Sequence, residues 1–185
     1  MALEVKPPMR TVKQLVSDDG IPRQASATQN VWLGTPEVFS FPSEGNLVKP
    51  FTTGKSYFAE FIVQCDLAKS EICILGWQVN WDALLAPQVR LYDVLLRAAQ
   101  RGVKIYVMPW SCTQPVQTYS DATKKVLESI NKRPDVKNKP VKVLLAKSFA
   151  PVNNSYYSHH QKQVIVDRKV AFIGGIDLSY GRYDD

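Results

Sequence analysis

The chain has 185 residues, 45% of them hydrophobic and 22% charged, which is typical of a globular protein of about one domain. With 23 Lys and Arg against 17 Asp and Glu, the net charge of +6 favours polyanionic partners only mildly. The three cysteines form no CxxC pair, Pro7 and Pro8 stand where a secretory leader would be apolar, and no apolar run of about 18 residues occurs. We therefore expect no disulfide framework, zinc site, ordinary signal peptide or membrane-spanning helix.

Two regions of different character follow one another along the chain. Residues 1–50 contain six prolines and little periodicity, which predicts an irregular N-terminal arm. Residues 51–185 alternate helical patterns with short apolar runs, which predicts an α/β domain with a mixed, largely parallel sheet flanked by helices. We expect helices at 55–69, 91–100 and from Ser120 onward. The expected strands are 71–75, 103–108, 141–146, 160–166 and 170–173, the last two joined as an antiparallel hairpin.

Both histidines of the chain lie side by side in "YYSHHQKQVIVD", residues 156–167. Because side chains alternate between the faces of a strand, His160 and Lys162 should project to the same side. An imidazole beside an ammonium suits phosphoryl chemistry, since the ammonium can bind phosphate oxygens and a neutral imidazole can attack phosphorus. The simpler interpretation is a hairpin whose histidines only form hydrogen bonds, and a lone HxK pair would favour it.

The neighbours of this pair take different expected roles. Asp167 has the opposite parity, which favours an orienting or structural role for it over a phosphate contact. His159 also has the opposite parity and should support the site from behind. Gly174 and Gly175, after the next strand, would let backbone N–H groups approach a phosphate closely.

Aromatic and basic segments add weaker indications. Trp77 and Trp81 follow a strand end, where α/β proteins place ligand sites, and they fit the core or the rim of such a site equally well. The basic residues between 132 and 142 read as a solvated surface loop, because no aromatic side chains interleave with them for base stacking.

The spacing "HQKQVIVD", six residues, then "GGIDL" resembles the HKD signature of the phospholipase D superfamily, HxK(x)4D(x)6G(G/S). Five residues fill its fixed positions: His160, Lys162, Asp167, Gly174 and Gly175. The continuation through Asp177 resembles true phospholipases D more than the small nucleases, which typically carry Gly-Ser-x-Asn there. The resemblance covers residues 51–185, and within the family the sequence is most similar to bacterial phospholipase D effectors of the type VI secretion system.

The resemblance implies one half of a phospholipase D-type α-β-α sandwich and a reaction through a phosphohistidine. Its catalytic residues would be His160, Lys162 and Asp167. His160 would be the nucleophile, and Lys162 would bind the phosphate oxygens. Gly174, Gly175, Asp177, His159 and Trp77 would bind phosphate or support the site, and neither a metal nor a cofactor is expected.

One departure from the family pattern affects these expectations. The family's active site uses two HKD motifs, and this chain has one. We expect the chain to be the N-terminal half of a phospholipase D, completed by a C-terminal half from the same gene product or a separate chain. The alternatives are a dimeric single-motif phosphodiesterase or endonuclease, and an inactive fragment that acts as a binding module.

The resemblance also implies partners and a location. The expected substrate is a membrane glycerophospholipid, cleaved to phosphatidic acid and a free headgroup, and nucleic acid is not the expected substrate. Trp77, Trp81 and Trp110 would line a lipid-facing rim. An effector would be made in the bacterial cytoplasm without a signal peptide and secreted to act on target-cell membranes. An immunity protein that blocks the site would be a natural partner.

Overall fold

The computed structural model describes residues 15–16, 22–23, 45–111, 117–147 and 158–184. The chain divides into two units, Met1–Pro50 and Phe51–Asp185, at the boundary where its composition changes. In the first unit, β1 (Leu15–Val16) and β2 (Pro22–Arg23) pair antiparallel, and most of the expected irregular arm lies outside the described residues. No helix among the described residues is long and apolar enough to cross a membrane.

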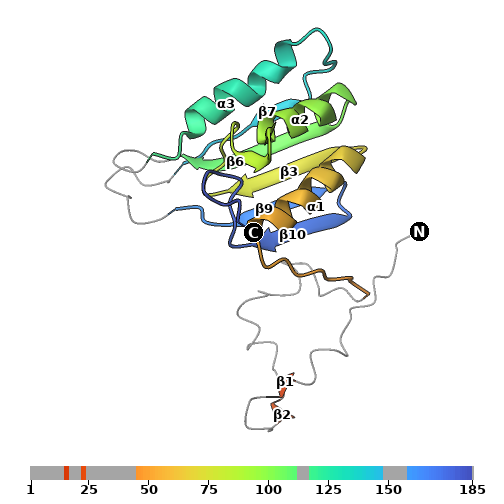
Figure 1. The fold of residues 1–185 in the computed structure, drawn as a ribbon, viewed down its shortest axis with the longest axis vertical. Helices are drawn as coiled ribbons and strands as arrows, with labels where there is room; N and C mark the ends of the chain where they lie inside the picture. Colours follow the sequence, from red (N-terminus) through yellow and green to blue (C-terminus); the bar gives the residue numbers. More distant parts are fainter. Residues whose placement is uncertain (1–14, 17–21, 24–44, 112–116, 148–157, 185) are drawn as a thin grey trace, which may run out of the picture. The chain divides into compact units, whose positions relative to one another are not determined.

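The second unit is built on a mixed sheet whose main path runs β10-β9-β3-β6-β7 (Figure 1). The central strand β3 pairs in parallel with β6, which in turn pairs in parallel with β7 and β8. On its other side β3 pairs antiparallel with β9, which forms a hairpin with β10. The expected parallel sheet with a terminal antiparallel hairpin is therefore confirmed. The bounds are β3 Glu71–Gly76, β6 Lys104–Ser111, β7 Val141–Val143, β8 Ala146–Lys147, β9 Lys162–Val166 and β10 Val170–Gly174.

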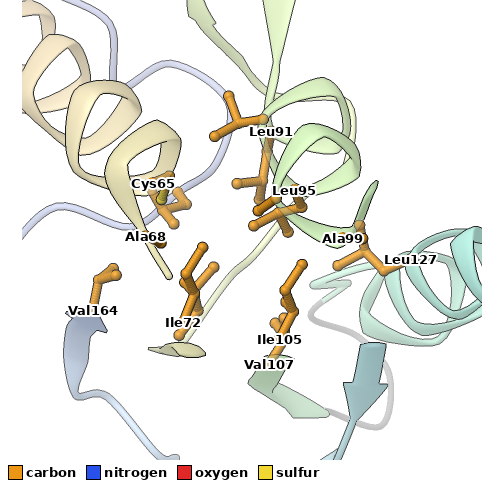
Figure 2. Close-up of a cluster of buried hydrophobic side chains, with 14 of the residues drawn as sticks. Cys65, Ala68, Ile72, Leu91, Leu95, Ala99, Ile105, Val107, Leu127 and Val164 are labelled. Atoms are coloured by element: carbon orange, nitrogen blue, oxygen red, sulfur yellow. The ribbon is translucent and has the colours of Figure 1, made fainter. Parts of the chain in front are cut away.

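The helices α1 (Gly54–Leu67), α2 (Leu91–Gln100) and α3 (Ser120–Ser129) pack on the sheet, and a 3-10 turn, η3 (Ile130–Lys132), continues α3. Figure 2 shows strand side chains such as Ile72, Ile105 and Val164 pointing toward a layer of helices. This core forms because apolar residues recur at alternate positions in the strands and three or four apart in the helices. The helical members include Phe58, Phe61 and Cys65 of α1 and Leu91, Val94, Leu95 and Ala98 of α2, all fully buried.

The expected strand 141–146 is interrupted, and Pro109 on the neighbouring strand gives the reason. The amide of Ile105 donates to the Pro140 carbonyl, and the amide of Leu144 donates to the Val107 carbonyl. The alternation of the ladder makes residue 109 the next donor from β6, but proline has no N–H. Pairing stops at Leu144, resumes at Ala146 opposite Trp110, and so divides the predicted strand into β7 and β8.

Two further features lay outside the sequence-based expectations. A small hairpin, β4 (Leu84–Ala86) with β5 (Val89–Arg90), is inserted between β3 and α2. The segment after β10 returns to the beginning of α1, where the Asp184 carboxylate accepts the Gly54 amide and the Asp184 carbonyl accepts the Lys55 amide. A carboxylate at a helix N-terminus satisfies free N–H groups and complements the helix dipole.

Candidate active site

The site lies at one edge of the sheet, where β3 and β6 end and β9 begins; this edge is on the left in Figure 1. His160 stands just before β9 and is exposed, whereas the strand itself begins at Lys162. The predicted strand therefore starts two residues later than expected. Lys162, Val164 and Val166 all face the core side, as the alternation predicts. The carboxyl ends of parallel strands are the usual location of ligand sites in α/β proteins.

The ammonium of Lys162 is buried and paired. Its side chain is 8% exposed, and Nζ lies 3.1 Å from Oδ2 of Asp177, whose side chain is 1% exposed. The same Nζ donates to the His160 carbonyl oxygen at 3.0 Å, so the nucleophile candidate and the lysine are joined through the backbone. A buried ammonium is tolerated only with such a counter-charge, because desolvating an unpaired charge is costly.

The other carboxylate oxygen of Asp177 holds the loop that follows β3. Oδ1 accepts the backbone N–H groups of Trp77, at 3.0 Å, and Gln78, at 3.2 Å. The Trp77 ring in turn lies 6.0 Å from the His160 ring, centroid to centroid, with an interplanar angle of 51°. Asp177 therefore joins the loop after β10, the start of β9 and the loop after β3.

The three tryptophans do not form a common rim. Trp110 stacks on Trp77 with centroids 5.9 Å apart and an 18° interplanar angle, and it is only 7% exposed. Trp81 packs edge-on against Tyr92 instead, with centroids 6.3 Å apart. The expectation of a lipid-facing rim is thus wrong for Trp110, which is buried behind Trp77 and whose carbonyl oxygen accepts hydrogen bonds from the Thr118 and Ser120 hydroxyls.

The glycines and the second histidine also lie near this edge. Gly174 is directly opposite Lys162 in the β9–β10 register, and an added Cβ at Gly174 or Gly175 would meet open space. Both backbones are exposed, so a phosphate could approach them. His159 is half-buried, and its Nδ1 atom has no hydrogen-bond partner in the described part of the chain.

Asp167 lies outside this site, at the opposite end of β9. Its carboxylate accepts the backbone amides of Lys69, Ser70 and Glu71 and the Ser70 hydroxyl, which fixes the turn between α1 and β3. Desolvation raises the pKa of Asp167, but the hydrogen bonds together outweigh it and hold the pKa well below its usual range. The contacts correspond to the structural role weighed for Asp167, and they place it too far along the strand to touch a phosphate beside Lys162.

The arrangement therefore offers an exposed imidazole next to a paired ammonium and open glycine backbone. Among the described residues, no group of three or more His, Cys, Asp or Glu side chains could hold a metal ion. Neither the pairing of Asp177 with Lys162 nor the support from Trp110 was predicted from the sequence. The sequence contained one indication of the Lys162–Asp177 pair, because a lysine on the buried face of a strand needs a counter-charge. The spacing of the motif did not identify which carboxylate supplies that charge.

Comparison with known proteins agrees with the motif. A family model described as "PLDc: Phospholipase D" matches residues 64–185. Phospholipase D C of Dictyostelium discoideum is 35% identical over 156 residues, which are 80% of this chain and 9% of that protein. Phospholipase D1 of Homo sapiens is 32% identical over 149 residues, which are 77% of this chain and 13% of that protein. The chain thus spans a small fraction of the length of these relatives.

A solved structure supports the fold separately. NucT from Helicobacter pylori aligns with a TM-score of 0.50 and 17% identity, over 71% of this chain and 73% of that chain. At this identity the likeness concerns the mixed α/β architecture alone. Because the family model covers most of the second unit, including the whole of the HKD-type segment, this chain belongs to the phospholipase D family.

Proposed function

We propose that the chain is one catalytic half of a phospholipase D that hydrolyses the phosphodiester bond of glycerophospholipids. The observation that carries the proposal is the exposed His160 imidazole at an open sheet edge, joined through its own carbonyl oxygen to the buried Lys162 ammonium. Family membership and the names of the relatives support the choice of reaction and substrate class.

In the proposed reaction a ring nitrogen of His160 attacks phosphorus, a P–N bond forms, and the P–O bond to the headgroup breaks. The departing alcohol takes a proton from a second histidine acting as general acid. That histidine then removes a proton from water, whose oxygen attacks phosphorus, and the P–N bond breaks to give phosphatidic acid. Lys162 would stabilise the charge on the non-bridging oxygens.

The second histidine must come from outside this segment. The chain contains only His159 and His160, and adjacent residues cannot approach a phosphorus atom from opposite sides. We infer that a second HKD half completes the site, either from the same gene product or from a separate chain.

Headgroup release tests this proposal. Choline release from phosphatidylcholine vesicles would be measured for the chain alone and for the chain combined with a second-motif half. We expect turnover only in the combination, its loss in His160→Ala, and its retention in the control variant Lys104→Ala, whose exposed side chain lies at the other end of β6. Full turnover in His160→Ala would contradict the assignment of the nucleophile.

We also propose, on the sequence resemblance alone, that the enzyme is a secreted effector of the type VI system, made in the bacterial cytoplasm and blocked by an immunity protein. The completed enzyme would then arrest growth of a bacterial host when exported to the periplasm and less so when retained in the cytoplasm. Equal growth in both cases would argue against an antibacterial effector.

A second candidate function is a dimeric single-motif endonuclease, which the net charge of +6 favours. Native mass measurement and plasmid nicking by the chain alone would test it. A homodimer that nicks plasmid DNA and leaves phosphatidylcholine intact would replace the phospholipase proposal. A monomer inactive in both assays even with a second half would instead favour a binding module.

A further inference from the structure

Lys162 uses two of its donors within the protein. An ammonium carries three N–H groups in a tetrahedral arrangement. One is directed to Oδ2 of Asp177 at 3.1 Å and another to the His160 carbonyl oxygen at 3.0 Å. Two fixed hydrogen bonds define the rotation of the ammonium, and therefore also the direction of the third N–H, for which the described residues supply no partner.

Asp177 meets donors on both of its oxygens. Oδ2 faces the Lys162 ammonium, and Oδ1 faces the backbone N–H groups of Trp77 and Gln78. Only an ionised carboxylate satisfies all three donors, because an asparagine would turn its NH2 group toward either the ammonium or the amides. The residue is also almost completely buried, so water cannot replace a lost acceptor.

These contacts argue against a direct phosphate contact by Asp177. A carboxylate and a phosphate repel one another, and both oxygens of Asp177 already have partners inside the protein. The residue instead connects Lys162 with the Trp77 loop, and the Trp77 ring contacts His160.

We infer that Asp177 is a positioning residue: it orients the Lys162 ammonium so that its third N–H is presented to a phosphate oxygen, and it holds the Trp77 loop against His160. Its action on catalysis rests on the proposed function, whereas its action on Lys162 can be tested in the chain as it stands. Of the two roles expected for Asp177 from the sequence, phosphate binding or support of the site, the proposal takes the second.

The first experiment observes the lysine itself. In the 185-residue chain with 15N-labelled lysine, the buried and hydrogen-bonded Lys162 ammonium should exchange its protons slowly and give a distinct NMR signal. Lys162→Arg identifies the signal by removing it. We expect Asp177→Asn to abolish the signal and Asp82→Asn to preserve it, because Asp82 contacts the Tyr180 hydroxyl instead of Lys162.

A stability measurement guards against a general loss of folding. If Asp177→Asn leaves an unpaired buried ammonium, then adding Lys162→Met should recover stability, so that the double variant has a higher urea midpoint than Asp177→Asn alone. An unchanged ammonium signal in Asp177→Asn, or a double variant no more stable than Asp177→Asn, would overturn the inference.

Catalysis gives the second readout. In the completed enzyme we expect Asp177→Asn to lower kcat about 100-fold, as a misplacement on the order of 1 Å can do, with KM changed less than about threefold. In a Lys162→Met background the Asp177→Asn change should cost nothing further, because the amide oxygen can then keep the Trp77 and Gln78 amides while no ammonium faces the NH2 group. An equal additional loss there would mean that Asp177 acts independently of Lys162. A parent enzyme without any phosphodiesterase activity would reject the proposed function, while the NMR result would still decide the role of Asp177.

Discussion

Substitution of Asp167 separates a structural from a catalytic role for the aspartate of the motif. Oδ1 accepts three hydrogen bonds, from the Ser70 amide, the Ser70 hydroxyl and the Glu71 amide, at 2.7–2.9 Å. Oδ2 accepts one, from the Lys69 amide at 2.9 Å. Asp167→Asn can keep the three bonds to one oxygen but turns its NH2 group toward the Lys69 amide. Asp167→Ala loses all four.

The two variants should therefore differ in a graded way. At about 1 kcal/mol for each net hydrogen bond, Asp167→Asn should lower the free energy of unfolding by about 1 kcal/mol and Asp167→Ala by about 4 kcal/mol. The backbone of Asp167 is left-handed, with φ of 52°, which asparagine tolerates better than alanine and which widens the difference. Urea denaturation of the chain measures both values.

The effect should also depend on pH. Desolvation raises the pKa of Asp167, but its hydrogen bonds outweigh that effect and lower the pKa far below the unfolded value of about 3.9. A carboxylate with a lowered folded pKa stabilises the protein above the unfolded pKa, and this stabilisation is lost as the pH falls through the folded pKa. The stability difference between the wild type and Asp167→Ala should be full at pH 6 and decrease at pH values below about 4.

The kcat of Asp167 variants distinguishes a structural role of this residue from a catalytic one. In the completed enzyme, Asp167→Asn should retain kcat to within about threefold at a temperature where the variant is folded, because Asp167 is separated from His160 by the length of β9, about 3.3 Å per residue. A loss of kcat comparable to that of a Lys162 variant, with unchanged stability, would refute the structural reasoning.

Three other substitutions test the packing of the second unit. Gly54→Ala should destabilise the chain by about 2 kcal/mol in urea, since its Cβ would overlap the Arg182 carbonyl oxygen and displace Asp184 from α1; a more stable variant would contradict this docking. Leu95→Ala should cost about 3 kcal/mol by leaving a cavity between α2 and the sheet, and a midpoint within error of wild type would mean that this core is loosely packed. Burial and the contact with Asp82 raise the pKa of Tyr180 to about 12, so the neutral phenol stabilises the wild type at low pH, and this stabilisation is lost as the pH rises from about 10 to about 12. Tyr180→Phe should remove this titration, seen in the absorbance at 295 nm, and also this pH-dependent loss of stability, seen in the urea midpoints at high pH.

Local sequence patterns were sufficient to predict those helices and strands whose burial depends on their own residues. The short apolar run at residues 72–75 predicts β3, and the helical spacing of Leu91, Val94, Leu95 and Ala98 predicts α2. The helix buries the face that its spacing marks, whereas the strand buries Ile72 and Ile74 almost completely and Cys73 and Leu75 only in part.

Features that depend on distant partners were not predictable in the same way. The pairing of Lys162 with Asp177 crosses the whole β9–β10 hairpin, and the burial of Trp110 depends on a stack with Trp77 from another strand end. The interruption opposite Pro109 was a missed local signal, since a proline within a strand removes a donor wherever that strand is internal.

The return of Asp184 to the first turn of α1 has a dynamic consequence. The Gly54 and Lys55 amides contact Asp184, a residue 130 positions away from Gly54 in the chain. The first turn of α1 and the segment after β10 therefore depend on each other for their hydrogen bonds. Local opening of either one should expose both, and amide hydrogen exchange at Gly54 and Lys55 should follow that of the residues around Asp184.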